Sequence, residues 1–574
     1  MLPRHLYYAA ALLLAPAPAF AELKIQAPGA TDALLENVRA HLDLSDEPCD
    51  APAWRVQREF RNIDRQIQPA LRALGYYHGK VEKRLERDDK CWHASLDLSL
   101  GPPVTVRRLD LEITGEAEQD AAFQAYARAL PLRPGDVLHH GHYEEIKSKL
   151  RNLAIQRGYF DADLTRHELR VDLNSNQADI ALSLVSGPRY HFGEVHLSEQ
   201  PLRPDFVRRL ADLEPGAPYD ATKLISLDRN LSDAGYFQHI EVLPRRDEIA
   251  DLAVPIDVNL APRPKHAWRT GVGYATDTGP RLSLGYINRY VNDRGHQLNS
   301  ELRLSPVQSG LTANYVVPGK NPHKQTYTFG VGLLHEDTDT SVSDSAQLSA
   351  RETLIRDGWT ETRSLELLHE QSTIGEEDTT ATLLMPGIGW TRIKADDPLR
   401  TRHGYRLNLN VRGAYEGLLS STSLLQVRAN AKGIHRFGDA GRVTARADLG
   451  MTLGGDFFDL PASLRFFAGG DNSVRGYAYK SLSPKDENGD AVGGRHLIAA
   501  SLEYEHPVVG EDWWGAVFAD AGNAFDTDQF QLKYAYGVGV RWYSPVGRLR
   551  VDLAFPSDTA EDSWRLHFGF GVDL

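Results

Sequence analysis

The chain has 574 residues, a formal net charge of −14 at pH 7 and two cysteines. It is too long for a single ordinary domain, so several domains are expected. The acidic balance and the lack of a basic patch argue against nucleic acid as a partner.

The first 21 residues have the pattern of a secretory signal. Arg4 and His5 precede an apolar run over residues 6–14, and an A-x-A cleavage site ends at Ala21. The run is too short to cross a membrane, so we expect export and removal of residues 1–21. No later stretch reaches the ~20 consecutive apolar residues of a transmembrane helix. The mature chain is therefore expected to be either soluble or a β-barrel.

Both cysteines, Cys49 and Cys91, lie in the first expected domain of the mature chain. In an oxidising compartment such a pair is expected to form a disulfide that stabilises this domain. Two buried free thiols are the alternative. Two cysteines without paired histidines nearby do not suggest a metal site.

Residues 22–264 repeat one pattern at intervals of roughly eighty residues. In each copy, apolar residues three and four apart predict a helix, and a glycine followed by two aromatic residues comes directly after it. The glycine suits the left-handed conformation that ends many helices. The three markers are Gly75-Tyr76-Tyr77, Gly158-Tyr159-Phe160 and Gly235-Tyr236-Phe237. We predict three tandem α+β domains of the order strand–helix–helix–strand–strand, at 22–102, 103–187 and 188–264.

Two polar clusters raise the question of a metal site. His139, His140 and His142 fall in an expected loop, which favours solvation over metal ligation. The segment 486–490 faintly resembles a calcium loop but lacks the full ligand spacing, which favours an exposed turn. The chain has no G-x-S-x-G, H-E-x-x-H or phosphate-binding glycine motif. We therefore predict no catalytic residues, no metal site and no cofactor, and hence no enzyme.

Residues 265–574 change to a strict alternation of polar and apolar side chains. Leu407, Leu409 and Val411, for example, alternate with Asn408 and Asn410. Segments of about ten residues with turns between them are typical of outer-membrane β-barrels, whose apolar face meets lipid and whose polar face lines the lumen. The length of this region allows about sixteen strands. The predicted fold is thus three α+β periplasmic repeats followed by a transmembrane antiparallel β-barrel.

Two short motifs stand out within the barrel region. They are Val474-Arg475-Gly476-Tyr477, in a long glycine-rich loop, and Phe518-x-Asp520-x-Gly522, in a strand-like run about forty residues later. A loop arginine and a strand aspartate could pair bidentately inside a barrel, where partial desolvation favours such a bond. A surface loop with a solvated Arg475 is the alternative.

Together these motifs resemble the signature of the BamA-like outer-membrane assembly superfamily. The resemblance implies a loop that tucks into the lumen and an Arg475 that meets Asp520 on the inner wall. The N-terminal repeats are similar to POTRA domains, the periplasmic modules of the same superfamily. It further implies a place in the outer membrane of a Gram-negative bacterium, with the repeats in the periplasm.

The last strand of the chain is amphipathic and rich in aromatic residues, with Phe568 and Phe570 on one face and Gly569 and Gly571 on the other. It resembles the signal by which outer-membrane proteins are themselves inserted, although it ends in leucine rather than phenylalanine. Glycines in a strand weaken side-chain packing. We therefore expect a loosely paired seam between this strand and the first barrel strand, at about residues 267–274.

Within the superfamily, three repeats and one barrel most resemble the TamA family, the outer-membrane part of the translocation and assembly module. This implies insertion or export of autotransporter-type and other outer-membrane proteins, through a weak seam and by strand augmentation. It also implies a TamB-like partner anchored in the inner membrane, unfolded outer-membrane protein clients and contact with outer-membrane lipid. A two-partner secretion pore for one dedicated substrate is the alternative.

Overall fold

The computed structural model describes residues 21–397, 400–438, 441–526, 530–544, 547–558 and 563–571. The expected secretory signal lies outside these residues, apart from Ala21. The chain divides into two compact units, and the division runs through the third repeat: His196–Leu213, Ser226–Leu243 and Asp257–Leu574 form the second unit. Among the helices of the described chain, none combines the length and apolar character needed to cross a membrane.

The first repeat is a three-stranded sheet with two α-helices. Its elements are β1 (Glu22–Gln26), α1 (Asp32–Ala40), η1 (Asp43–Asp46), α2 (Ala53–Ala73), β2 (Lys80–Arg87) and β3 (Trp92–Ser99), with sheet order β1–β3–β2. The apolar face of α2, which includes Ile63 and Ile67, is fully buried against the sheet. Cys49 and Cys91 form a disulfide that joins the segment before α2 to the start of β3.

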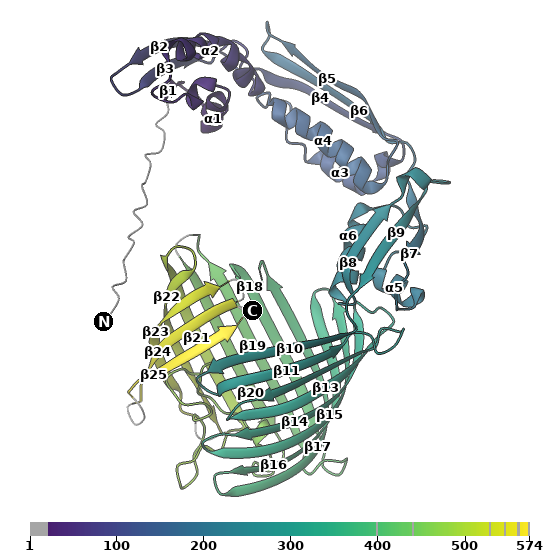
Figure 1. The fold of residues 1–574 in the computed structure, drawn as a ribbon, viewed down its shortest axis with the longest axis vertical. Helices are drawn as coiled ribbons and strands as arrows, with labels where there is room; N and C mark the ends of the chain where they lie inside the picture. The colour runs from purple at the N-terminus through teal and green to yellow at the C-terminus, as the bar shows by residue number, and fades with distance from the viewer. Residues whose placement is uncertain are drawn as a thin grey trace, which may run out of the picture. The chain divides into compact units, whose positions relative to one another are not determined.

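The second repeat has the same order of strands and α-helices. They are β4 (Thr105–Thr114), η2 (Glu116–Gln119), α3 (Ala121–Arg128), α4 (His140–Arg157), β5 (Asp163–Asp172) and β6 (Gln177–Val185), with sheet order β4–β6–β5. Figure 1 shows α3 and α4 on one side of this sheet. The loop expected for the histidines is wrong, because His139 caps α4 and its ring accepts a hydrogen bond from the backbone N–H of His142 at 3.3 Å.

The third repeat completes the series. It consists of β7 (His191–Leu197), α5 (Pro204–Ala211), α6 (Ala221–Asp233), β8 (Phe237–Pro244), η3 (Arg246–Glu248) and β9 (Ala253–Pro262), with sheet order β7–β9–β8. In all three repeats the marker glycine has positive φ, at 88° for Gly75, 83° for Gly158 and 75° for Gly235. The expected strand–helix–helix–strand–strand order is therefore present three times.

An arginine links the second repeat to the start of the third. Arg157, the last residue of α4, donates to Asp120 at 3.1 Å and to Asp220 at 2.7 Å. Gly158 follows, and a Cβ at this position would lie 2.6 Å from the Cβ of Tyr219. A glycine is thus required here both by the backbone conformation and by the close approach of the next repeat.

The remainder of the second unit is a 16-stranded sheet in which each strand pairs antiparallel with the next along the chain. Its strands are β10 (His266–Ala275), β11 (Gly279–Asn288), β12 (Gln297–Leu304), β13 (Gln308–Pro318), β14 (Gln325–Asp337), β15 (Ser341–Arg356), β16 (Trp359–Ile374), β17 (Glu377–Ala395), β18 (His403–Ala414), β19 (Leu424–Arg436), β20 (Arg442–Leu453), β21 (His496–Val509), β22 (Trp513–Phe525), β23 (Lys533–Ser544), β24 (Gly547–Pro556) and β25 (Arg565–Gly571). The predicted fold class is confirmed.

One face of this sheet is apolar and exposed, as expected for a wall that meets lipid. Trp268 and Val272 on β10 and Phe570 on β25 are 66%, 87% and 54% exposed. The opposite face carries the charged residues that alternate with them. Figure 1 shows the strands curving round so that β25 comes next to β10.

The part of the third repeat that belongs to the second unit contacts the barrel turn that follows β11, and Arg209 of α5 donates to the carbonyl of Gly319 in the turn that follows β13, at 3.3 Å. The Tyr236 hydroxyl donates to the carbonyl of Gly295 at 2.6 Å, and Arg203 pairs with Asp293 at 2.7 Å. Because strand direction alternates, the β10–β11 turn and the long connection between β20 and β21 lie at the other end of the barrel. Both can therefore meet at that end.

Candidate functional site

The long connection between β20 and β21, residues 454–495, folds into the barrel, and we call it the inward loop. It includes the short helix η4 (Ala462–Leu464) and three backbone bridges, Phe466 to Gly494, Ala468 to Leu482 and Lys485 to Ala491. Its apolar residues pack with inner-wall residues of β21, β22 and β23 in one buried cluster. The cluster consists of Phe466, Ala468, Val474, Tyr477, Leu482, Leu497, Ala524 and Ala535. The loop is therefore packed against the wall rather than solvated.

Arg475 lies at the centre of this contact and is 1% exposed. Its Nε donates to Asp520 Oδ2 at 2.8 Å and its Nη2 donates to Asp520 Oδ1 at 2.9 Å, which is a bidentate pair. The backbone N–H of Arg475 also donates to Asp520 Oδ2, at 3.0 Å. The structure thus brings together the arginine and the aspartate that the sequence motifs suggested, and the solvated alternative does not hold.

The other two residues of the strand motif, Phe518 and Gly522, pack against the loop motif. The guanidinium of Arg475 lies 3.4 Å from the ring centroid of Phe518, a close cation–π contact. A Cβ at Gly522 would come within 2.9 Å of Val474 Cγ2 and 2.6 Å of a backbone carbonyl, so a larger residue would push the loop away. In the loop motif, Gly476 has φ of 95° and Tyr477 donates to the carbonyl of Tyr534 at 3.3 Å.

The arginine has further partners that the sequence motifs did not identify. Its Nη1 donates to Glu503 at 2.7 Å and to Asp552 at 3.0 Å. Arg541 binds the same two carboxylates, at 2.7 Å and 2.5 Å. All of these side chains are buried on the inner faces of β21, β23 and β24. In the sequence, these residues can be recognised only as charged residues on the polar face of the strands. The alternation of polar and apolar residues does not predict which of them form ion pairs.

A second carboxylate on β21 extends this network. Glu505 is fully buried and pairs with Arg442 at 2.9 Å and Arg548 at 2.6 Å, and it accepts from the Tyr543 hydroxyl at 2.9 Å. A buried ion pair gains little over an apolar core, but breaking one by removing a partner is costly. The network reaches the inward loop through Arg475, so the ion pairs of Arg475 hold the loop against the inner wall.

The expected seam strand occupies the end of the barrel sheet. Phe568, Gly569, Phe570 and Gly571 lie in β25, and residues 572–574 are outside the described chain. β10 and β25 stand at the two ends of the sheet order, and no ladder joins them in the described residues. The rings of Tyr274 on β10 and Phe568 on β25 are neighbours, with centroids 6.2 Å apart. The Phe568 N–H also donates to Oγ1 of Thr276, the residue after β10, at 2.7 Å.

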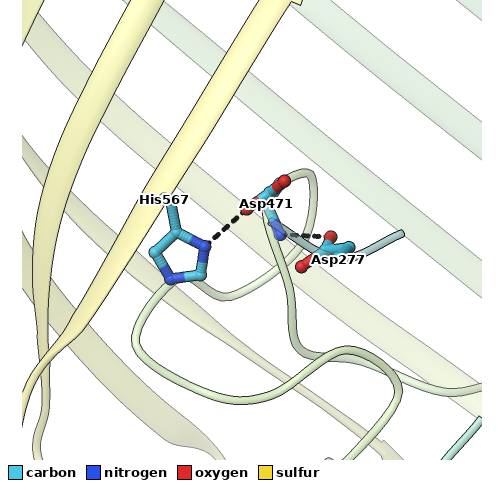
Figure 2. Close-up of side chains that lie close together, drawn as sticks. All are labelled: Asp277, Asp471 and His567. Atoms are coloured by element: carbon cyan, nitrogen blue, oxygen red, sulfur yellow. Dashed lines mark hydrogen bonds and ion pairs between the residues drawn. The ribbon is translucent and has the colours of Figure 1, made fainter. Parts of the chain in front are cut away.

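Within the described residues, one set of three side chains could offer ligands to a metal ion: Asp277, Asp471 and His567, whose donor atoms lie within 4.8 Å of one another. Figure 2 shows that these side chains come from the β10–β11 turn, the inward loop and β25. Hydrogen bonds join Asp471 to each of the other two residues.

Comparison with known families supports this architecture. The Omp85 superfamily domain matches residues 266–573, and the POTRA domain TamA domain 1 matches residues 23–100. The chain is 23% identical over 512 residues to the outer membrane protein assembly factor BamA of Neisseria meningitidis serogroup B. The matched region covers 75% of this chain and 62% of that protein. A second BamA, from Nitratidesulfovibrio vulgaris, is 36% identical over 124 residues, which is 20% of this chain and 16% of that protein.

The fold is also similar to a solved structure, that of BamA from Haemophilus ducreyi lacking POTRA domains 1–3. The TM-score is 0.66 at 16% sequence identity, over 81% of this chain and 99% of the other. At this identity the likeness concerns the fold alone. The match of the barrel model covers more than half of the chain, and the chain therefore belongs to the Omp85 superfamily.

Proposed function

We propose that this protein is the outer-membrane subunit of a translocation and assembly module of the TamA type. An Omp85 barrel preceded by POTRA-type repeats lies in the outer membrane of a Gram-negative cell, with its repeats in the periplasm. Two observations support the TamA type in particular. The first repeat matches the first POTRA domain of TamA, and two further repeats with the same order of strands and α-helices precede the barrel. The chain spans about 62% of the length of the Neisseria BamA.

The proposed activity is the insertion or export of autotransporter-type and other outer-membrane proteins through the seam between β10 and β25. The observation that carries this proposal is the lack of a ladder between these two strands in the described residues. Few backbone hydrogen bonds would have to break for the wall to open. Lipid cannot satisfy the freed backbone groups, so an incoming client strand that pairs with the edge of β10 would satisfy them.

The proposed partners follow from the same arrangement. Unfolded outer-membrane proteins would engage the edge of β10, and outer-membrane lipid would contact the opened wall. A TamB-like protein anchored in the inner membrane would bind the periplasmic repeats. Each repeat has sheet edges, β1 and β2 in the first, where an extended segment could add as a further strand. None of these steps requires a covalent reaction.

The test is site-specific photo-crosslinking in living cells from Arg39, an exposed residue at the end of α1. Arg151, which is exposed on α4 of the second repeat, serves as the matched position. We expect Arg39 to crosslink to a very large protein anchored in the inner membrane, identified by mass spectrometry. A single secreted polypeptide as the crosslinked species would overturn the proposal in favour of a two-partner secretion pore.

A further inference from the structure

We propose that Asp471 of the inward loop is the centre of a clasp that holds the two edges of the seam together. One edge contributes Asp277, in the turn that follows β10, and the other contributes His567, on β25. This inference rests on the proposed lateral opening and names what would control it: the wall opens when the inward loop releases one of its two edges.

Asp471 contacts both edges with different parts of one residue. Its carboxylate Oδ1 lies 2.6 Å from His567 Nδ1, and its backbone N–H donates to Asp277 Oδ2 at 2.7 Å (Figure 2). Asp471 is 4% exposed and His567 is 2% exposed, so water competes little for these hydrogen bonds. A single loop residue thus bridges strands that no ladder connects in the described chain.

The hydrogen bonds assign the protonation of the histidine ring. His567 Nε2 accepts from the backbone N–H of Gly476 at 2.9 Å, so this nitrogen carries no proton. The neutral ring then carries its proton on Nδ1 and donates it to Asp471. Both ring nitrogens are therefore engaged with the inward loop. A metal ion at this set would have to displace these bonds, so we interpret the set as a hydrogen-bonded clasp rather than a metal site.

The clasp is connected to the buried ion network, because residues of the two are adjacent in the chain or hydrogen-bonded to each other. Gly476, which binds His567, directly follows Arg475 in the chain, and Arg475 is held on the wall by Asp520. On the opposite side, Arg550 of β24 donates to the carbonyl of Asp471 at 2.9 Å. The inward loop is thus bound to the last strands of the barrel. Its hydrogen bond to Asp277 connects these last strands to the first hairpin, across the seam.

A glycine permits the contact with the first hairpin. Gly470, directly before Asp471, has φ of 98°, and a Cβ at this position would lie 2.6 Å from Asp277 Oδ2. The missing side chain lets the carboxylate of Asp277 reach the loop backbone. The local conformation of the loop is therefore suited to binding the β10–β11 turn.

The experiment measures the width of the seam directly in the full chain, in lipid vesicles. Spin labels on Val272→Cys and Phe570→Cys, both exposed on the lipid face of the two edge strands, report the distance across the seam by double electron–electron resonance. The native cysteines are joined in a disulfide and do not react. In Asp277→Ala we expect the ratio of wide to narrow seams to rise about tenfold or more, as for loss of one charge-assisted hydrogen bond.

Two further variants separate the clasp from general damage. Asp277→Asn keeps an oxygen that can accept the hydrogen bond from the Asp471 N–H. Its distribution of seam widths should therefore stay closer to that of the unsubstituted chain. His567→Gln should widen the seam from the other side, because its amide reaches the place of Nε2 but not of Nδ1. Asp344→Ala is the matched control, since it breaks an Asp–His hydrogen bond of 2.8 Å to His335, between β14 and β15 and away from the seam.

The outcomes distinguish the clasp from the proposed function. A wider seam in Asp277→Ala and His567→Gln, with no change in Asp344→Ala, supports the clasp. If client assembly in cells is then unchanged, the clasp stands and the lateral route fails. If folded Asp277→Ala and His567→Gln keep the distance distribution of the control, the clasp is wrong whatever happens to assembly. If Asp277→Ala does not fold, His567→Gln alone decides.

Discussion

Replacing Arg475 with alanine tests whether the buried ion network anchors the inward loop. The substitution removes both guanidinium bonds to Asp520 and the cation–π contact with Phe518. Glu503 and Asp552 each keep Arg541 as a partner. The carboxylate that loses most of its pairing is therefore that of Asp520.

The magnitude follows from what remains around Asp520. Its oxygens keep the backbone N–H of residue 475, and Arg446 lies 3.7 Å away. Removing one partner of a buried ion pair costs about 3–5 kcal/mol of folding free energy, because an incompletely paired charge stays buried. Arg475→Lys keeps the charge but not the planar fork of donors, so its loss should be smaller but measurable.

The measurement is guanidinium chloride unfolding of the full chain in lipid vesicles, followed by tryptophan fluorescence and linear extrapolation. Arg428→Ala is the control: it removes a lumen arginine that is half exposed and pairs with Asp448 at 2.6 Å, so it should cost at most about 1 kcal/mol. If folded Arg475→Ala loses no more stability than Arg428→Ala, the network does not anchor the inward loop.

Three further predictions concern the disulfide of the first repeat, the packing of the strand motif and the carboxylate of Asp120 in the second repeat. Cys49→Ser removes a disulfide that spans 42 residues and should destabilise the first repeat by about 4 kcal/mol. Proteolysis of that repeat should be faster than in the unsubstituted chain, and equal rates of proteolysis would contradict this prediction. Gly522→Val should displace Val474 and cost about 1–3 kcal/mol, seen as new protease sensitivity of the inward loop, whereas an unchanged digest would refute the close packing. Burial opposes the ionisation of Asp120, but a backbone N–H and Arg157 lower its pKa below the ordinary value. The ionised Asp120 therefore stabilises the fold fully above its ordinary pKa, and this stabilisation is lost as the pH falls through the lowered pKa. The urea midpoint for unfolding of the repeats should therefore drop in acid, and Arg157→Ala should make this midpoint less dependent on pH.

The repeats and the barrel were predictable from sequence because their signals are local. A helix buries residues three and four apart, and a strand in a barrel wall alternates, so each element carries its own pattern. The glycine of each repeat marker could be placed at a helix end because positive φ strongly favours that residue. The sequence predicts a loop for His139, His140 and His142 because no apolar period marks the first turn of α4, although His139 caps this helix and the other two lie in its first turn.

For the candidate site, the sequence by itself determined that an arginine in a glycine-rich loop and an aspartate in a strand form part of one barrel. Only the tertiary structure decided which charges meet: Glu503 and Asp552 are placed beside Arg475 by the register of β21 to β24, and Asp277 is brought to His567 by closure of the barrel. Contacts at this closure join residues as far apart as Thr276 and Phe568, which are 292 positions apart in the chain. No local period encodes them, because they depend on how sixteen strands close on one another rather than on any one strand.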